Sequence, residues 1–371
     1  MEFHKLNGYL SEQSVITFSS DVLSFKYANN SFSFNWKKGR LNYKRRKTLY
    51  IPAERNIVSV IPNWFEVNLG SNNTRSYLAD WETVRKYFFK KNPLSILDIG
   101  KYYHNASDNS DHILTKDNID ILMESASSGL QAVVPLQALM QYYGYNYYND
   151  SLKRKESNVN IQQKMHHLYG NILQQLLNTL SNEEIAAWES KRNEIIKENN
   201  DISLLSEEVR RSLIFPNPEI ESQYNRIASQ FRYPSSTAFF IEEPELNLYP
   251  ITQYKLVNTI VKMVNEMNHT LFITTHSPYI LTSLNNLIYA GEIGKKHHKE
   301  IAKVIPKHLW IKKNYVSAWK INADTYMLEN LLADDLNILK AEELDDISEI
   351  INNQFSELFK IAHQEEEYIN L

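Results

Sequence analysis

Two adjacent carboxylates, Glu242 and Glu243, directly follow the apolar segment Thr237–Ile241. An open α/β sheet binds its ligands at the carboxyl ends of its strands. Phosphoryl transfer needs acidic groups at such a place, one to hold Mg²⁺ and one to polarise the attacking water. Glu242 is therefore the candidate metal ligand, acting through water, and Glu243 the candidate general base. An acidic turn that caps the following helix is the alternative interpretation.

A second apolar segment, Thr270–Thr274, is followed closely by His276. A histidine at a strand end can donate a hydrogen bond to a γ-phosphate or position a water molecule, although an ordinary loop histidine fits the same pattern. One amphipathic helix, predicted over Tyr249–Asn268, separates the two apolar segments. This spacing predicts that the two strands are parallel neighbours, so Glu243 and His276 would emerge at the same edge of the sheet.

A third segment, Ser127–Gln131, opens a helix whose apolar face is predicted to begin at Leu130. Backbone N–H groups and the positive end of the helix dipole at Ser128 and Gly129 favour an anion. An ordinary helix cap with a flexible entry explains the same residues without any ligand.

Taken in this order, the three segments resemble the signature, Walker B and switch-histidine motifs of ABC-class ATPases. The segments that carry the resemblance are Glu124–Gln131, Glu242–Glu245 with Leu248–Pro250, and Thr274–Pro278. The Glu-Glu-Pro-Glu form is typical of the bacterial AAA-type ATPases related to RecF and to the overcoming-lysogenization-defect (OLD) nucleases.

The resemblance implies ATP and Mg²⁺ as cofactors, and a homodimer or hetero-oligomer that shares its nucleotide sites. Glu243 would activate water, His276 would sense the γ-phosphate and Glu242 would hold magnesium. By analogy of fold and motif, the ATPase would act in a DNA transaction or in antiphage defence. The signature residues that would complete the site of a partner subunit are Ser127, Ser128, Gly129 and Gln131.

The sequence lacks a phosphate-binding loop, which requires Gly, four residues and then Gly-Lys-Ser/Thr. Its Gly-Lys pairs, Gly100-Lys101 and Gly294-Lys295, have neither the earlier glycine nor the following Ser or Thr. We therefore expect the first strand, the loop and its helix to belong before Met1 or to be supplied in trans. With such a loop the chain is expected to be an ATP hydrolase.

Two other functions remain open at this stage. A regulatory or interaction protein could retain the ATPase-like fold without turnover. A nuclease would need clustered carboxylates, but Asp334-Asp335 and Asp345-Asp346 lack the strand-end arrangement of a toprim domain, so a fused nuclease is not expected.

The pattern of elements predicts an α/β fold: the mostly parallel sheet of an ABC-type ATPase core, with an N-terminal antiparallel β segment and a helical insertion. Strands are predicted at Val22–Tyr27, Ser31–Trp36, Leu41–Tyr50 and Leu287–Ala290, and a helix at Thr74–Lys91. The predicted domains are 1–131, a β-rich lobe ending in the signature; 132–232, the helical insertion; 233–300, the Walker B and switch-histidine part; and 301–371, an α/β tail.

The 371 residues carry a net charge of −4 and no cysteine, which excludes disulfides and thiolate metal sites. No apolar run approaches the roughly 20 residues that span a bilayer, so a cytoplasmic protein without a membrane partner is expected. The basic segments 37–47 and 295–299 could contact nucleic-acid phosphates, or they could simply be solvated. The helical insertion could cap the site, dimerise or hold an effector protein.

Overall fold

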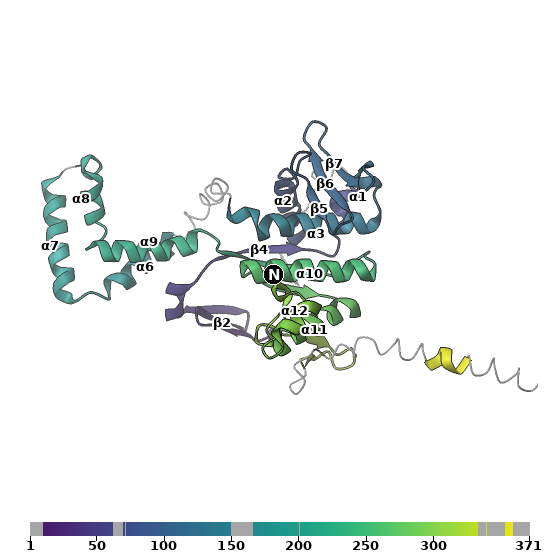
Figure 1. Cartoon of the computed structure of the whole chain (residues 1–371). Helices are drawn as coiled ribbons and strands as arrows, with labels where there is room; N and C mark the ends of the chain where they lie inside the picture. Colours follow the sequence, from purple (N-terminus) through teal and green to yellow (C-terminus); the bar gives the residue numbers. More distant parts are fainter. Residues whose placement is uncertain are drawn as a thin grey trace, which may run out of the picture. The chain divides into compact units, whose positions relative to one another are not determined.

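The computed structural model describes residues 10–61, 70, 72–149, 166–199, 201–332, 339 and 353–358. The chain divides into two compact units, and each unit combines two separate stretches of sequence (Figure 1). Unit 1 comprises Met1–Lys47 with Asn146–Thr237, and unit 2 comprises Thr48–Tyr145 with Ala238–Leu371. None of the helices in the described ranges is both long enough and apolar enough to cross a membrane.

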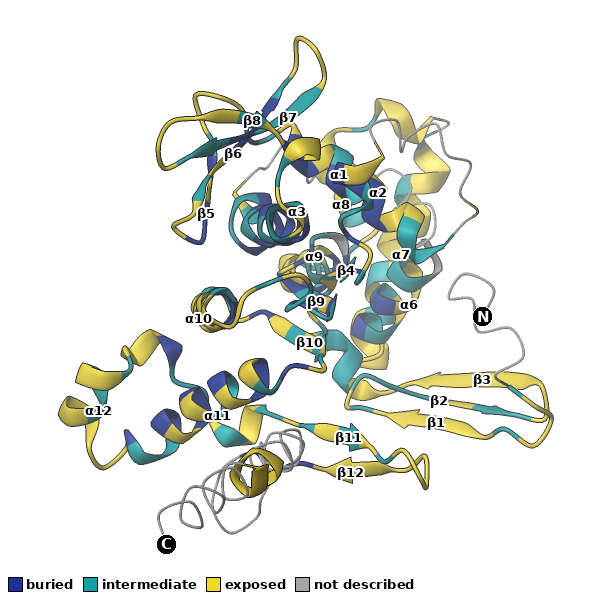
Figure 2. Cartoon of the chain, turned by 90° about the vertical axis from the view of Figure 1, so that its right-hand side faces the viewer, coloured by how far each residue is buried: buried dark blue, intermediate teal, exposed yellow. Residues whose placement is uncertain are grey.

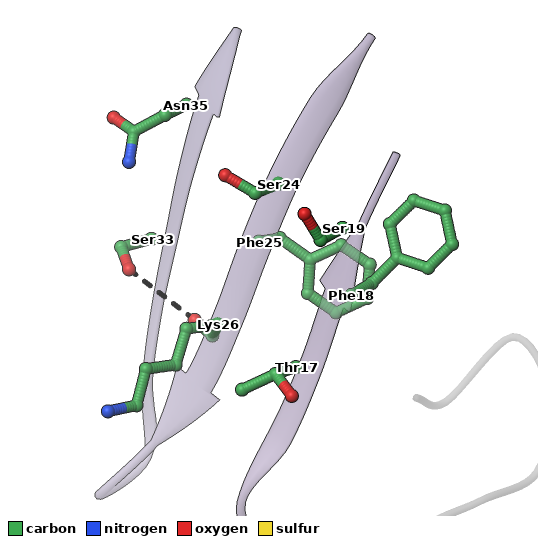
Figure 3. A pocket seen from close by; sticks show the side chains of 8 residues that line it. All are labelled: Thr17, Phe18, Ser19, Ser24, Phe25, Lys26, Ser33 and Asn35. Carbon is green, nitrogen blue, oxygen red and sulfur yellow. Dashed lines mark hydrogen bonds between the residues drawn. The ribbon is translucent and has the colours of Figure 1, made fainter. Parts of the chain in front are cut away.

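The N-terminal part of unit 1 is a three-stranded antiparallel meander, of which the sequence predicted the second and third strands but not the first. Its strands are β1 (Ile16–Ser19), β2 (Leu23–Ala28) and β3 (Ser31–Trp36). Asn29 and Asn30, with φ of 51° and 55°, turn the chain between β2 and β3. Phe25 lies opposite Phe18 and Phe34, so alternation places aromatic rings on one face and small polar residues on the other. A hollow of about 290 Å³ lies along this sheet. Figure 3 shows the side chains that border it: Thr17, Phe18, Ser19, Ser24, Phe25, Lys26, Ser33 and Asn35.

Most other described residues of unit 1 lie in helices. A core of Ile172, Leu176, Ile220, Ile227 and Phe231 joins two of its helices. Ser181 caps the next helix in a reciprocal capping box with Glu184. The helices are α6 (His166–Leu177), α7 (Asn182–Glu198), α8 (Glu207–Ser212) and α9 (Pro218–Arg232), with short 3₁₀ turns at Lys38–Asn42, Asn146–Tyr148 and Ile202–Leu204.

Unit 2 contains the sheet that positions the candidate site. Its strand order is β10-β9-β4, and β9 and β10 are parallel. Leu49, Ile51, Phe239 and Ile241 are buried in this sheet. The elements are β4 (Arg46–Ile51), β9 (Ser236–Glu242), α10 (Pro250–Met267), β10 (Thr270–Thr274) and α11 (Pro278–Ile293). The alternation of strand and helix confirms an α/β architecture with a parallel strand pair.

Helix α3 (Ser128–Gly144) is buried along most of its length (Figure 2). It packs against α2 (Asn73–Arg85) and α10, and its last residue, Gly144, lies so close to Met263 that a Cβ there would be 2.2 Å from the sulfur. His269 Nε2 also contacts the Gly144 carbonyl oxygen at 2.8 Å. These contacts fix the far end of α3 against the helix that connects β9 to β10.

A second sheet in unit 2 is antiparallel throughout, in the order β5-β6-β7-β8. Its strands are β5 (Leu94–Ile96), β6 (Gly100–Asn105), β7 (Ser110–Thr115) and β8 (Asp120–Leu122). The remaining elements are α1 (Ile57–Val60), α12 (His298–Val304), β11 (Trp319–Ile321) and β12 (Leu328–Asn330), with 3₁₀ turns at Met123–Ser125, Lys307–Leu309 and Lys313–Tyr315.

Three sequence-based predictions of elements were wrong. Leu287–Ala290 lies inside α11 and is not a strand, because Leu287, Ile288 and Ala290 are buried on a helix face. A short apolar run cannot be assigned to helix or strand by its length alone. Leu41–Tyr50 does not extend the meander; its second half begins β4, which pairs with β9. Helix α2 ends at Arg85 rather than Lys91, since Phe89 forms a β-bridge with His104.

Candidate functional site

The parallel pairing of β9 and β10 brings the two predicted motifs to one sheet edge. Thr274 lies opposite Glu242, and the Glu243 backbone N–H donates to the Thr274 carbonyl at 2.9 Å. His276 Nε2 then lies 3.9 Å from Glu243 Oε1. The His276 side chain is 89% exposed and that of Glu243 is 36% exposed, so both are open to solvent. The predicted adjacency of Glu243 and His276 is therefore present, and their chemical roles stay predictions.

Glu243 has a left-handed backbone, with φ of 41°. A non-glycine residue in this region is uncommon and costs about 1–3 kcal/mol, so the surroundings must hold it there. The conformation turns the chain sharply at the end of β9. The Glu243 side chain therefore leaves the sheet on a path that a regular strand would not give it.

Glu242, the predicted metal ligand, is half-buried and already hydrogen-bonded. Its Oε2 accepts the Ala53 backbone N–H at 3.4 Å. Its carboxylate also accepts the Tyr50 hydroxyl, and burial together with this negatively charged acceptor raises the pKa of Tyr50 well above its usual value. Tyr50 therefore stays protonated and keeps donating to Glu242. No sequence pattern indicated this pairing, because Tyr50 lies on β4, far from Glu242 along the chain.

Glu245 anchors the loop that carries His276. Its Oε1 accepts the Thr275 hydroxyl at 2.7 Å and the His276 backbone N–H at 2.8 Å. Its Oε2 is buried and has no hydrogen-bond partner within the described ranges. Ser277 extends the anchoring: its hydroxyl donates to Gln253 Oε1 at 2.6 Å, and Gln253 Nε2 donates to the Leu248 carbonyl at 2.8 Å. The two loops at the sheet edge are thus held together by side chains.

Arg55 follows β4 and was not among the residues predicted for the site. Its side chain is fully buried beneath the turn after β9. It donates to backbone carbonyl groups of Pro52, of the turn and of α3, and to no carboxylate of the described residues. Because charge pairing is absent, no pattern of opposite charges in the sequence could have revealed its partners.

The predicted signature residues lie at the N-terminus of α3. Ser127 caps this helix, with its Oγ accepting the Leu130 N–H at 3.4 Å. Gly129 packs against the turn after β9, where a Cβ would come within 2.8 Å of the Asn247 carbonyl oxygen. Ser127 and Ser128 are exposed, and no hydrogen bond among the described residues joins them to Glu243 or His276.

Gln131 does not point outward with the two serines. Its Nε2 donates to the carbonyls of Met123 and Glu124 at 3.3 and 2.9 Å, which ties the helix to the preceding 3₁₀ turn. The exposed serines are therefore available to a ligand or a partner, while Gln131 supports the helix start. Contact between Gln131 and nucleotide stays a prediction. Such a contact would require the hydrogen bonds from Gln131 Nε2 to the Met123 and Glu124 carbonyls to break.

The described residues contain no cluster of three or more His, Asp or Glu side chains able to hold a metal ion. A Mg²⁺ ion that arrives with nucleotide would use one or two carboxylates together with phosphates and water. Glu242, the predicted metal ligand, could serve as such a carboxylate, because its half-buried side chain retains acceptor capacity beyond its two donors. The acidic pairs Asp334-Asp335 and Asp345-Asp346 lie outside the described residues.

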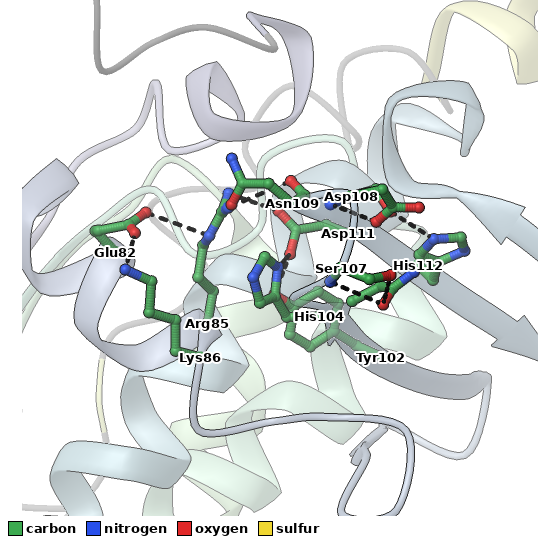
Figure 4. A network of polar contacts seen from close by, with 12 residues as sticks. Glu82, Arg85, Lys86, Tyr102, His104, Ser107, Asp108, Asn109, Asp111 and His112 are labelled. Carbon is green, nitrogen blue, oxygen red and sulfur yellow. Dashed lines mark hydrogen bonds and ion pairs between the residues drawn. The ribbon is translucent and has the colours of Figure 1, made fainter.

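The strongest polar network of unit 2 surrounds Asp111 in the second sheet (Figure 4). Asp111 accepts from Tyr102 Oη at 2.7 Å and from Arg85 Nη1 at 3.1 Å, and His104 Nδ1 lies 3.0 Å away. Arg85, Tyr102 and His104 are all buried. With its oxygens occupied in this way, Asp111 joins α2 to the β6–β7 hairpin and has a structural role.

The two basic segments lie apart in sequence and make different contacts. In 37–47, Lys37 Nζ donates to Ser19 Oγ at 2.7 Å, and Arg40 Nε donates to Gln175 Oε1 at 3.0 Å. In 295–299, Lys295 pairs with Glu292 at 2.9 Å. Some basic side chains of both segments are therefore already bonded within the chain. Binding of nucleic acid by either segment stays a prediction.

Comparison with known proteins supports the assignment of the sheet edge. Residues 225–281 match the family model of an AAA ATPase domain. The matched range begins in α9 and ends in α11, so it contains Glu242, Glu243, Glu245 and His276. No curated protein and no solved structure matches the chain. The part of the chain that builds this sheet edge is therefore similar to an AAA ATPase domain, which supports an ATPase of the phosphate-binding-loop class.

Proposed function

We propose that this chain provides the water-activating half of an ABC-class ATPase site. The observation that carries the proposal is the position of Glu243 Oε1 3.9 Å from His276 Nε2 at the carboxyl end of two parallel strands. A carboxylate and an imidazole at such an edge can flank one water molecule and one terminal phosphate. The similarity of residues 225–281 to an AAA ATPase domain points to the same chemistry.

In this proposal Glu243 accepts a hydrogen bond from the attacking water and orients it toward the γ-phosphate. His276 donates to a γ-phosphate oxygen and, being highly exposed, can reorient when nucleotide arrives. Glu242 holds Mg²⁺ through water while Tyr50 and Ala53 fix its carboxylate. Magnesium would neutralise charge on the phosphates. Arg55 offers no contact to phosphate, since its N–H groups bond to backbone carbonyls.

The site also needs a phosphate-binding loop, and unit 2 offers a place for it. Among the described strands β10 is outermost in its sheet, and its Phe272 is 58% exposed. The Phe272 ring lies beside that of Phe240, tilted by 37° with the ring centroids 5.7 Å apart, and Phe240 is 39% exposed. Parallel sheets normally have both faces covered. The strand that precedes a phosphate-binding loop could pair in parallel with β10 at this edge, and the loop would then lie beside His276. The helix that follows the loop would cover the rings of Phe240 and Phe272.

The exposed N-terminus of α3 favours a composite site. Ser127, Ser128 and Gly129 would approach the nucleotide of a second subunit, so ATP would join two copies or two related chains. The motif resemblance supports membership of the RecF- and OLD-like group and a role in DNA transactions or antiphage defence, and the sequence composition supports a cytoplasmic location. A nucleic-acid or effector partner could use the segments 37–47 and 295–299 or the helices α6–α9.

ATP turnover decides between an ATPase and a non-hydrolysing regulatory protein. Phosphate release is measured on the purified chain and on the assembly isolated from its native source. We expect turnover in the preparation that contains a phosphate-binding loop, and a loss of about 10²–10⁴-fold for Glu243→Gln. Glu300→Gln, an exposed change in α12, is the matched control. Turnover that Glu243→Gln leaves unchanged would exclude Glu243 as the base. ATP binding without turnover in both preparations would favour the regulatory alternative.

A further inference from the structure

We propose that Arg55 is a positioning residue that holds the backbone of Glu243 and couples it to helix α3. The catalytic part of this inference rests on the proposed ATPase function. The mechanical part rests only on the hydrogen bonds of Arg55. The two parts can therefore fail separately.

The guanidinium group of Arg55 donates hydrogen bonds to three segments of unit 2. Nη1 donates to the carbonyls of Pro52 and Glu242 at 3.3 and 3.0 Å. Nη2 donates to the carbonyls of Glu243 and Pro244 at 3.0 and 3.2 Å. Nε donates to the Ala132 carbonyl at 3.0 Å, in the second turn of α3. All five N–H groups of the side chain are used, because a guanidinium carries five donors.

Three of these bonds go to consecutive residues of the turn after β9. They fall on both sides of the left-handed Glu243, whose φ of 41° needs external support. The Glu243 N–H bonds to Thr274, so Arg55 on one side and β10 on the other fix the whole peptide. Their combined effect is to set the direction in which the Glu243 carboxylate leaves the sheet.

The burial of Arg55 makes this arrangement stiff. Its side chain is 0% exposed, and burial lowers the pKa of Arg55 despite the nearby Tyr77, Glu245 and Glu243. A buried cation that loses a partner leaves unsatisfied groups in a medium of low dielectric, so its bonds are costly to break. The fully buried Tyr77 hydroxyl donates to the Arg55 carbonyl at 2.5 Å and fixes the backbone of the arginine as well.

Helix α3 therefore touches the Glu243 turn at two points. Arg55 joins the turn to Ala132, and Gly129 packs directly against the Asn247 carbonyl. Ser127 and Ser128, at the exposed start of the same helix, are the residues proposed to meet a second subunit. A displacement of α3 by that subunit would reach the Glu243 backbone through Arg55. Contact with a second subunit would thereby change the position of Glu243, the residue proposed to orient water.

Amide hydrogen exchange of the full chain tests the coupling without requiring ATP turnover. Arg55→Lys keeps the charge but cannot span three segments. We expect the protection of 242–247 and of 129–132 to fall together, by about tenfold. Arg85→Lys is the matched control, since Arg85 is also buried in unit 2 but bonds to Asp111 and Asn109. It should leave both segments protected.

A second variant and a kinetic measurement keep the test decisive. If Arg55→Lys does not fold, Tyr77→Phe removes one bond to the Arg55 backbone and should raise exchange in the same two segments. Unchanged exchange in 242–247 in the variant that folds would overturn the proposal. In a preparation that hydrolyses ATP, Arg55→Lys should lower kcat about tenfold or more while changing KM little. Loss of protection in the variant, with no ATP turnover by the wild type either as the purified chain or in the native assembly, would refute the ATPase and leave the mechanical coupling intact.

Discussion

The Glu245 carboxylate holds the backbone of His276. Its Oε1 accepts the His276 N–H at 2.8 Å and also accepts the Thr275 hydroxyl at 2.7 Å. His276 thus combines an anchored backbone with a side chain that is 89% exposed. This combination suits a residue that must stay in place while its imidazole ring responds to a ligand.

Replacing Glu245 should loosen the loop that carries His276. Glu245→Ala removes the acceptor of two hydrogen bonds and should lower the free energy of unfolding by about 1–3 kcal/mol. Glu245→Gln keeps an acceptor oxygen and should lose less. Urea denaturation measures the stability, and hydrogen exchange at 275–277 measures the loosening. Equal stability of the Ala and Gln variants would show that the two hydrogen bonds do not hold the loop.

His276→Ala should separate activity from stability. The exposed imidazole makes few contacts, so the free energy of unfolding should change by less than about 0.5 kcal/mol. If His276 contacts the γ-phosphate, ATP turnover should fall by about 10²-fold or more. Turnover is measured in the preparation in which the wild type is active. His298→Ala, in the basic segment 295–299, is the control. Unchanged turnover in His276→Ala would remove this residue from the site.

A methyl group at Gly129 should disturb the contact between α3 and the turn after β9. The new Cβ would lie 2.8 Å from the Asn247 carbonyl oxygen, and both partners are backbone. Gly129→Ala should therefore destabilise the chain by about 1–3 kcal/mol. Gly170→Ala is the matched control, because α6 has open space at that position. It should stabilise α6 by about 0.5–1 kcal/mol. Thermal unfolding measures both, and a stable Gly129→Ala chain would refute the close contact.

The sheet edge was predictable because its determinants are local. Two apolar segments that end in polar residues, with one helix between them, have few arrangements other than neighbouring parallel strands. The register that puts Thr274 opposite Glu242 confirms this inference. The same local reasoning located the adjacent strands β2 and β3 of the meander.

Contacts between distant segments were not predictable in this way. Arg55 bonds to carbonyl oxygens, which every residue has, so its sequence context does not identify its partners. Tyr50 meets Glu242 only because β4 joins β9, and the composition of Leu41–Tyr50 fits a meander equally well. Residues 287–290 are apolar enough for either a strand or a helix, and packing against the C-terminal segments decides for the helix.

Alkaline pH should destabilise unit 2 through Tyr50 and Tyr77. Burial, with the Glu242 carboxylate as acceptor, raises the pKa of Tyr50 above the ordinary value of 10.0, and burial also raises that of Tyr77. The folded state therefore binds these protons more tightly than the unfolded state does. The stabilisation from each protonated tyrosine is fully present below the pKa that the tyrosine has in the unfolded chain. It is lost as the pH rises from that value toward the pKa of the same tyrosine in the folded chain.

The free energy of unfolding should thus fall above about pH 10, by up to about 1.4 kcal/mol per pH unit for each such tyrosine. Chemical denaturation between about pH 8 and pH 11 measures this slope. This range brackets the ordinary tyrosine pKa of about 10. Tyr50→Phe removes one titrating group. It should therefore reduce the slope by up to the contribution of one tyrosine, about 1.4 kcal/mol per pH unit. Tyr315→Phe, at a side chain that is 77% exposed, should leave the slope as in the wild type. The same slope in Tyr50→Phe and in the wild type would show that Tyr50 does not hold its proton against Glu242.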